Sequence, residues 1–463
     1  MHQTTTILTE LSNFMNRESL NISQLSRLAG LNSGTVSSMI NGRKVMSVEQ
    51  LDRLTASMGL AEGFFYEEYV RDYLMEASPN WRRIRPFLYR CAELGKLDCI
   101  QQTVNFLMDN LAYSSPLFEV AEDFFRSNKH DAAALLYEVI AESEQKQHSE
   151  RLAVCQYRLF MIIQGNDQEL NYRAAIQFEP FVERLDEMEQ LDALKDLANA
   201  YRALNRWDKV EKIVERLEHK TKVFYFSERD RRELFSKRPN RPLFFYLAYS
   251  YLLRGNICDL RGDYEQALHY IQLYADLSWV EENDQETLHW KSLFEEWSHA
   301  NFLLTRLSSG DESMLSEYVA YIEPKKDEIV LSLLNIMEAA NRFEINVDDI
   351  LQRFEGEVGS ITKKTTSLGV YTQQMITDSI SRLLNELSSY YLHKGDYSEG
   401  FKYLLDSLEK CSKINNKACI IKCVGLFELF REHASIETNS AYKKLISEVY
   451  EDEKKMGVTP LVK

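Results

Sequence analysis

Apolar residues recur at intervals of three and four along nearly the whole chain, which is the spacing of helices that bury one face. In the first 60 residues this pattern predicts helices over Thr4–Met15, Ile22–Ala29 and Ser33–Ile40, and a fourth helix that opens at Ser47 and runs to Met58. Only 8 Pro and 17 Gly occur in 463 residues, so few positions interrupt a helix. The pattern therefore predicts an all-α protein.

The second and third of these helices are separated by a tight turn, Gly30-Leu31-Asn32, where glycine can take the left-handed conformation that a sharp reversal needs. Leu25 and Leu28 in the helix before the turn are predicted to point inward. Val36 and Ile40 in the helix after it are predicted to face the same core. The two helices and their turn thus form one small packed motif.

Residues 25–60, LSRLAGLNSGTVSSMINGRKVMSVEQLDRLTASMGL, combine the glycine of the turn, a Thr-Val-Ser helix core, an Asn-Gly-Arg-Lys segment and a last helix ending in Gly-Leu. Together these features resemble the Xre/Cro/repressor type of helix-turn-helix domain. The resemblance implies that the helix Ser33–Ile40 enters the major groove of double-stranded DNA. The DNA-contacting residues would then be Ser33, Thr35, Ser37 and Ser38 at base edges or phosphates, with Asn41, Arg43 and Lys44 on the backbone.

The head departs from this family in two respects. Ile22 opens the second helix where glutamine is frequent, and Ser33 and Ser38 stand where a base-reading Arg or Gln is common. Hydroxyl groups discriminate bases poorly, so specificity would rest partly on DNA shape and on paired half-sites. The alternative is a helical subdomain that contacts another protein.

From about Trp81 onward a different pattern recurs, in which two helices are joined by a short turn of Gly or Asn with a polar residue and an aromatic. The clearest copies are YLLRGNICDLRGDYEQALHYIQLYADL (251–277) and LLNELSSYYLHKGDYSEGFKYLLDSL (383–408), which turn at Gly262 and Gly395. Weaker copies turn at Gly95, Asn128 and Asn205. Small residues near the turns, which allow paired helices to approach closely, are Gly255, Ala267, Ser388 and Gly400.

These copies resemble tetratricopeptide repeats over most of residues 81–435. Gly95 and Asn128 lie 33 residues apart, and the 133 residues from Gly262 to Gly395 are close to four units of about 34. The fold class predicted for the body is therefore a tetratricopeptide-like α-solenoid. Stacked helix pairs of this kind form a superhelix with a concave groove that suits an extended peptide.

In tetratricopeptide repeats the first helix of each pair lines the groove. Counting back from the turns places these polar candidates on that face: Lys195, Asn199, Arg202, Asn256, Asp259, Asn301, Arg382, Asn385 and His393. An Asn amide donates and accepts at once, so it can pair with the main chain of a peptide. The alternatives for each residue are a solvated helix face or a hydrogen bond between repeats.

The combination of head and body resembles the cytoplasmic peptide-pheromone receptors of Gram-positive bacteria, and its layout resembles that of the phage-encoded arbitrium receptors. The resemblance implies a homodimeric regulator of transcription, with quorum-sensing logic, whose repeat domain binds a short signalling peptide. Peptide binding would alter the spacing or mobility of the two heads and thereby the affinity for the operator. The competing hypothesis keeps the DNA-binding head but lets the repeat domain bind a partner protein, such as a response regulator or an anti-repressor.

Four regions follow from these patterns: a helix-turn-helix domain (1–61), a linker helix (62–80), a tetratricopeptide-like domain (81–435) and a C-terminal helix (436–463). The last region contains an amphipathic segment, Ala441–Met456, that either dimerises or caps the last repeat. Residues 219–242 form an insertion with eight Lys and Arg against three acids. The insertion is interpreted as a solvated connection, a lid over the groove or an additional phosphate contact.

Charge is distributed unevenly along the chain. The net charge is −16, which by itself argues against nucleic acid, but residues 1–60 carry five basic and four acidic side chains and the remainder carries −17. The head can therefore approach a phosphate backbone, and dimerisation is expected to supply much of the affinity.

No run of apolar residues is long enough for a membrane span, and the N-terminus does not resemble a signal peptide. The seven cysteines show no disulfide framework, which favours a cytoplasmic location. Cys419 and Cys423 lie one helical turn apart. They are interpreted as small packed side chains, with a shared metal as the alternative, and no metal site or cofactor is predicted. The motifs of zinc peptidases, P-loop enzymes and serine hydrolases are absent, so the sequence predicts no enzyme.

Overall fold

The computed structural model describes residues 6–75, 79–145, 149–226, 238–325, 328–360 and 370–457. Every regular element in these ranges is a helix and none is a strand, which confirms the all-α class. None of the helices in the described ranges is both long and apolar enough to cross a membrane. The chain divides into two compact units, Met1–Ile162 and Ile163–Lys463. The finer division predicted from the sequence stays a prediction.

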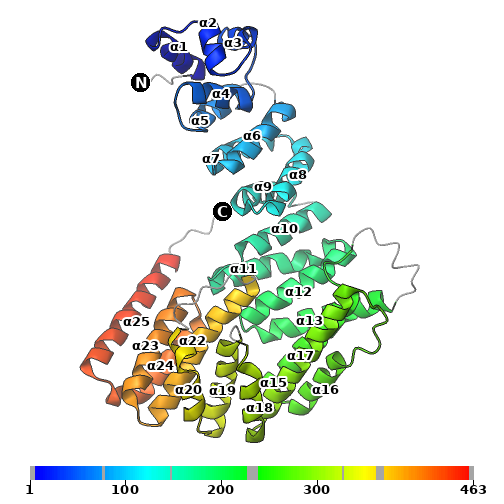
Figure 1. The fold of residues 1–463 in the computed structure, drawn as a ribbon, viewed down its shortest axis with the longest axis vertical. Helices are drawn as coiled ribbons and strands as arrows, with labels where there is room; N and C mark the ends of the chain where they lie inside the picture. The colour runs from blue at the N-terminus through cyan, green and yellow to red at the C-terminus, as the bar shows by residue number, and fades with distance from the viewer. Residues whose placement is uncertain are drawn as a thin grey trace. The chain divides into compact units, whose positions relative to one another are not determined.

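The first unit holds α1 to α10 (Figure 1). The bounds are α1 Ile7–Arg17, α2 Ile22–Leu28, α3 Ser33–Ile40, α4 Val48–Ser57, α5 Tyr66–Tyr69, α6 Trp81–Glu93, α7 Leu97–Leu107, α8 Ser114–Arg126, α9 His130–Ser143 and α10 Glu150–Ile163, with a π-helical turn at Val70–Met75 and a 3-10 turn at Leu111–Tyr113.

Side-chain hydrogen bonds join α4 and the segment just before it to the helices that follow. The Tyr69 hydroxyl donates to the Met46 carbonyl at 2.8 Å, and the Tyr66 hydroxyl donates to Asp52 Oδ1 at 2.8 Å. The Arg90 guanidinium on α6 donates to the same Asp52 carboxylate at 3.0 Å. The helix α5 is therefore hydrogen-bonded to α4 and to the segment just before it.

One of the inward-facing predictions in the head is wrong. Leu28 is 59% exposed, because the buried face of α2 is centred on Leu25, Ser26 and Ala29, and Leu28 lies outside it. In α3 the fully buried side chains are Val36 and Met39, whereas Ile40 at the end of the helix is half-buried.

The second unit holds the remaining helices (Figure 1). Their bounds are α11 Gln168–Phe178, α12 Glu187–Ala203, α13 Trp207–Tyr225, α15 Leu243–Leu260, α16 Tyr264–Ala275, α17 Gln285–Ser308, α18 Leu315–Ile322, α19 Ile329–Phe343, α20 Asp348–Arg353, α21 Glu355–Ser360, α22 Val370–His393, α23 Tyr397–Lys413, α24 Lys417–Phe430 and α25 Ile436–Gly457, with 3-10 turns at Glu179–Arg184, Glu312–Met314 and Arg431–His433.

Successive helices of the second unit pack on one another in sequence order. The pairs α12 with α13, α13 with α15, α15 with α16 and α22 with α23 are among the most extensive contacts, together with α19 and α22, which the short helices α20 and α21 separate in the chain. Packing of this nearest-neighbour kind is typical of a helical repeat protein. The structure therefore agrees with a repeat architecture at the level of helix stacking.

All five turns predicted from the sequence are confirmed. Gly95, Asn128, Asn205, Gly262 and Gly395 each have a positive φ, between 55° and 83°. Glycine and asparagine tolerate this left-handed conformation, so they end the first helix of a pair and allow the second to fold back.

The regular spacing predicted after Gly262 is not kept. The next left-handed residues between helices are Gly310, Glu344 and Gly395, at intervals of 48, 34 and 51 residues. Here α17 and α22 are both long, at 24 residues each, while α20 and α21 have only six each. The described residues of this stretch, which leave out 326–327 and 361–369, therefore do not follow four equal units.

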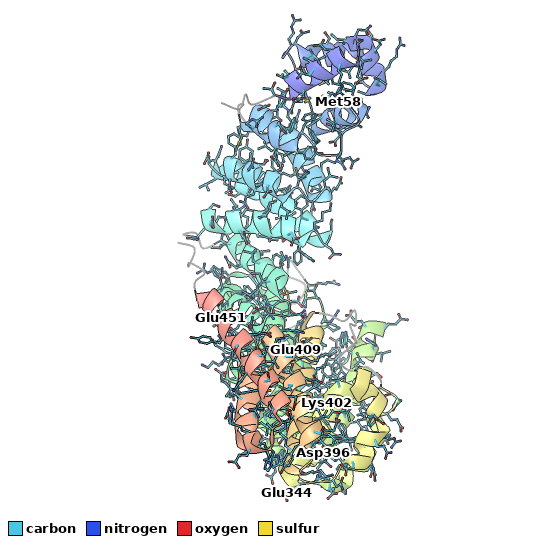
Figure 2. All side chains as sticks on the ribbon, turned by 90° about the vertical axis from the view of Figure 1, so that its left-hand side faces the viewer. Met58, Glu344, Asp396, Lys402, Glu409 and Glu451 are labelled. Atoms are coloured by element: carbon cyan, nitrogen blue, oxygen red, sulfur yellow. The ribbon has the colours of Figure 1, made fainter. Side chains whose placement is uncertain are left out.

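The C-terminal helix α25 covers the last hairpin of the unit. Tyr442 stacks on Phe427 of α24 with ring centroids 3.6 Å apart, and Leu445 and Ile446 pack against the same apolar cluster. The N-cap of α23, Asp396, and two charged residues along this helix, Lys402 and Glu409, are labelled in Figure 2. The packing of α25 matches the capping interpretation of this segment, and a role in dimerisation stays a prediction.

The basic insertion predicted at 219–242 begins inside a helix, since α13 continues to Tyr225. Residues 227–237, which carry half of its basic side chains, lie outside the described residues.

Candidate DNA-contact surface and ligand cavity

The helix α3 presents a polar surface that begins at its first residue. Ser33 is exposed, and Thr35, Ser37 and Ser38 are half-buried on the sides of the helix. Asn32 caps the helix, because its Oδ1 accepts the Gly34 backbone N–H at 2.9 Å. The N-terminal turn of α3 is thus fixed by its own cap, which leaves the Ser33 hydroxyl free to face a partner.

Two of the predicted DNA-contact residues already donate hydrogen bonds to carbonyl groups of α3. The Ser38 hydroxyl donates to the Gly34 carbonyl at 2.8 Å, and the Asn41 amide donates to the Ser37 carbonyl at 2.9 Å. Arg43 and Lys44 follow the left-handed Gly42 and are both exposed. These two cations are the strongest electrostatic feature next to α3.

The second unit encloses a cavity of about 320 Å³, which we call the main cavity. Its walls come from α12, α15, α17, α19 and α22, together with Trp207 at the start of α13. The polar and charged side chains that line it are Arg202, Asn205, Asn256, Asp259, Asn301, Ser308, Asn335, Glu338, Arg342, Asp378, Ser379 and Arg382. A site of this size and polarity can accept a small polar ligand or a few residues of a peptide.

Five of the residues predicted to bind a ligand line the main cavity: Arg202, Asn256, Asp259, Asn301 and Arg382. They converge because each lies on the first helix of its pair, on the face that the turn directs toward the middle of the unit. The structure thus brings these five together, while their role in binding stays a prediction.

Three other predicted residues lie elsewhere. Lys195 pairs with Asp196 at 3.1 Å, and Asn199 accepts a hydrogen bond from the Tyr249 hydroxyl. Asn385 is buried and donates to the Cys423 sulfur at 3.4 Å. It misses the main cavity because it lies on α22 about 10 Å beyond Asp378, a distance set by the helical rise, and faces α24.

His393, the ninth candidate, lines a second cavity of about 540 Å³. This cavity lies between the C-terminal ends of α19 and α22, and Asn346, Tyr390 and Lys394 also border it. It shares no lining residue with the main cavity, so His393 belongs to a separate place in the fold.

Part of the polar surface of the main cavity is already paired. Arg382 forms an ion pair with Glu338, and its other terminal nitrogen lies 3.9 Å from Asp378. Asn301 donates to the Tyr274 hydroxyl at 2.9 Å, and Asn335 donates to the Tyr318 hydroxyl at 3.1 Å. These contacts position the walls and reduce the number of groups that are free for a ligand.

Three groups in the main cavity remain without such partners. Within the described ranges, no hydrogen bond is made by the side chains of Arg202 and Asn256, and Asp259 Oδ1 is buried with no hydrogen-bond partner. Burial raises the pKa of Asp259, against the effects of Thr305 and Arg342. An unpaired guanidinium, an amide and an unpaired carboxyl oxygen together suit a ligand that carries both signs of charge and amide groups.

Asp378 lines the main cavity and also contacts residues near the start and near the end of the second unit. Its carboxylate accepts hydrogen bonds from Gln168 at 3.1 Å, Asn205 at 3.0 Å and Asn416 at 2.5 Å. Burial raises the pKa of Asp378, and the nearby charge of Arg382 acts in the opposite direction. The carboxylate therefore joins three helical hairpins through one buried polar group.

Two further bonds join the same segments. The Gln168 backbone N–H donates to the Ile414 carbonyl at 3.1 Å, and Asn415 donates to Asp167 at 2.5 Å. Together with the three bonds to Asp378 we call them the closing network. They bring α22 beside α12, as Figure 1 shows, although Asn205 and Asp378 are 173 residues apart. The first and last parts of the second unit therefore meet beside the main cavity.

Sequence reasoning misses several residues of the main cavity, chiefly Asn335, Glu338 and Arg342 on α19. No repeat copy is recognisable there, because the turn after α19 uses Glu344, a residue type that rarely takes a positive φ. Apolar periodicity in residues 329–343 is the available signal, and it predicts the helix without indicating which face meets the cavity.

No protein-family model matches the chain, and no curated protein matches it. A solved structure described as "Circular tandem repeat protein with novel repeat topology and enhanced subunit contact surfaces" is similar with a probability of 0.99 and a TM-score of 0.17. The similarity covers 96% of this chain and 100% of that chain at 11% sequence identity. A TM-score this low does not establish a shared fold.

Proposed function

We propose that this protein is a DNA-binding transcription regulator whose helical-repeat body binds a short signalling peptide in the main cavity, and that the peptide modulates binding to a double-stranded DNA operator. The observation that carries the proposal is the convergence of five independently predicted residues on one cavity. The proposed protein acts as a homodimer in the cytoplasm. The alternative is a regulator of the same kind whose body binds a partner protein.

The DNA-binding part of the proposal rests on the motif of α2, the Gly30 turn and α3. Gly30 has a φ of 63°, and Arg53 donates to its carbonyl at 3.1 Å, so the turn is held from outside. The hydroxyls on α3 and the exposed cations Arg43 and Lys44 lie on or directly after the proposed recognition helix. This distribution suits contacts to phosphates, with a smaller direct contribution from base edges.

The peptide part rests on the chemistry of the main cavity. The Asn256 amide can donate to and accept from a peptide bond. Arg202 can pair with a carboxylate, and Asp259 can accept from an amino or guanidinium group. A volume of about 320 Å³ holds part of a short peptide, and the rest would extend from the opening. Since ligands act only through unequal affinity for two states, the peptide must prefer one arrangement of the dimer.

Arg43→Ala and Lys44→Ala are each expected to weaken binding of DNA from the gene's own upstream region by about threefold to tenfold at low ionic strength. Each variant removes one phosphate-neutralising cation per protomer, so the slope of log K against log salt should become shallower by about 0.9 for every phosphate left unneutralised. Fluorescence anisotropy over a salt series measures both quantities.

Arg17→Ala is the matched control for this experiment, because Arg17 lies on α1 and its side chain is 72% exposed. It should leave the affinity and the salt slope unchanged. If the full chain binds no DNA at low salt, or if all three variants behave alike, the head is not a DNA reader.

Asn256→Ala and Arg202→Ala are expected to weaken peptide binding by about tenfold or more, since each loses hydrogen bonds in a partly buried site. The probes are short synthetic peptides from small open reading frames with secretion signals beside the gene, and isothermal titration measures the affinity. Lys195→Ala is the control, because Lys195 is predicted from the sequence but lies outside the cavity.

Loss of binding in Lys195→Ala with normal binding in Arg202→Ala would mean that another surface is used. If no peptide binds the intact chain while one host protein is recovered with it from lysate, the partner-protein alternative replaces the peptide proposal.

A further inference from the structure

Three cysteine side chains meet in the interior of the hairpin formed by α23 and α24. Cys411 comes four residues before the left-handed Asn415, Cys419 comes four after it, and Cys423 lies one turn farther along α24. All three are buried, and their sulfur atoms lie within 4.8 Å of one another. The sequence indicates only Cys419 and Cys423 as neighbours, since Cys411 is on the preceding helix.

Two polar groups lie next to this thiol cluster, one on α23 itself and one on the neighbouring helix α22. The Ser407 Oγ lies 3.3 Å from the Cys423 sulfur and 3.8 Å from the Cys419 sulfur. Its proton goes to the Ser381 carbonyl at 2.7 Å, so its oxygen lone pair is directed at the sulfurs. The Asn385 amide donates to the Cys423 sulfur. Burying an amide and a hydroxyl beside three thiols costs more free energy than filling the same space with apolar side chains.

The spacing of the sulfurs is close to that of a tetrahedral metal site. With metal–sulfur bonds of about 2.3 Å, sulfurs in such a site are about 3.8 Å apart, so the cluster needs to contract by at most about 1 Å.

We propose that Cys411, Cys419 and Cys423 form a binding site for a soft divalent metal ion of the Zn²⁺ and Cd²⁺ class, with the Ser407 oxygen as the fourth ligand. Binding forms three metal–sulfur bonds and releases three thiol protons to solvent, with no oxidation or reduction. The bound group carries one net negative charge. The Asn385 N–H stabilises that charge as an outer hydrogen-bond donor, in the way that such donors tune metal affinity elsewhere.

The proposed site lies behind the main cavity. From α22, Asn385 donates to the Cys423 sulfur and the Ser381 carbonyl accepts from Ser407, and the same helix supplies Asp378 and Arg382 to the main cavity. A metal at the cluster would therefore brace α22 against α23 and α24. The proposal does not depend on what the main cavity binds.

The test is a titration of the reduced, metal-free full chain with Cd²⁺, followed by sulfur-to-metal charge-transfer absorption and by metal analysis after gel filtration. Samples are incubated to equilibrium, because ions reach a buried site through local opening. One Cd²⁺ per chain is expected, with displacement by Zn²⁺. Cys423→Ser is expected to weaken binding by more than about 100-fold, and Asn385→Ala by about tenfold, as for loss of a ligand and of an outer donor.

Cys258→Ser is the matched control, since Cys258 is half-buried on α15 and outside the cluster. It should leave the stoichiometry at one. Helix content by circular dichroism checks each variant, and Cys411→Ala, which is small and apolar, is used if Cys423→Ser does not fold. The proposal is overturned if the folded wild type takes up no stoichiometric Cd²⁺, or if the folded cluster variants bind as well as the wild type.

Discussion

Replacing Asp378 by alanine is expected to lower the free energy of unfolding of the second unit by about 3 kcal/mol. The carboxylate accepts from Gln168, Asn205 and Asn416, and the alanine leaves these amides without their acceptor. Asn416 is 5% exposed, so it loses its partner without gaining water, whereas Asn205 is exposed and contributes less. Urea unfolding of the full chain, followed by circular dichroism, measures the change.

Asp378→Asn separates the hydrogen bonds from the charge. It keeps one acceptor oxygen and the shape of the side chain, and it removes the cost of burying a charge, so its effect should be clearly smaller than that of alanine. Hydrogen exchange should show faster opening of α11 and α24, which the closing network joins. Faster exchange confined to these two helices would show that the closing network has been lost, whereas a general loss of stability would speed exchange in the whole unit.

The matched control for Asp378 is Glu323→Ala. Glu323 pairs with Arg353 in a contact where both side chains are about half exposed, and such surface pairs contribute at most about 1 kcal/mol. An Asp378→Ala variant that unfolds at the same urea concentration as Glu323→Ala would mean that the closing network contributes nothing to stability.

The turns and the helices beside them are predictable because they depend on local chemistry. Asn205 and Gly262 mark left-handed turns with residue types that tolerate positive φ, and counting back one helix from them finds Arg202, Asn256 and Asp259. The same counting fails for Asn385. A periodicity argument places residues around a helix, but it does not reveal which neighbouring helix covers each part of its length.

The closing network cannot be predicted from the sequence in this way. Gln168 and Asp378 are separated by 210 residues, and no local pattern links an amide in one hairpin to a carboxylate in another. The thiol cluster is missed for a related reason, because Cys411 approaches Cys423 only when the hairpin turns at Asn415. Contacts of both kinds depend on the three-dimensional packing of the helices, which cannot be predicted from local patterns in a single sequence.

Two glycines at helix contacts in different hairpins, one before its turn and one after, are expected to respond to alanine with opposite signs. A Cβ at Gly400 on α23 would lie 2.6 Å from Leu392 Cγ and 3.1 Å from the Leu392 backbone nitrogen. Leu392 is 1% exposed and has no space to withdraw. Overpacking of this kind costs about 1–3 kcal/mol, so Gly400→Ala should destabilise the second unit by about 2 kcal/mol after the gain in helix propensity.

Gly255→Ala on α15 is the paired measurement. Its Cβ would meet Tyr270 Cβ at 3.5 Å and the Ala267 carbonyl at 3.6 Å, which are ordinary contacts. With no clash to offset it, the gain in helix propensity should stabilise the unit by about 0.5–1 kcal/mol. Urea midpoints of the two variants, compared with wild type, test both signs at once. Equal destabilisation by both alanines would show that the two hairpins are packed alike, and that the close approach of α22 to α23 at Gly400 is not what requires glycine there.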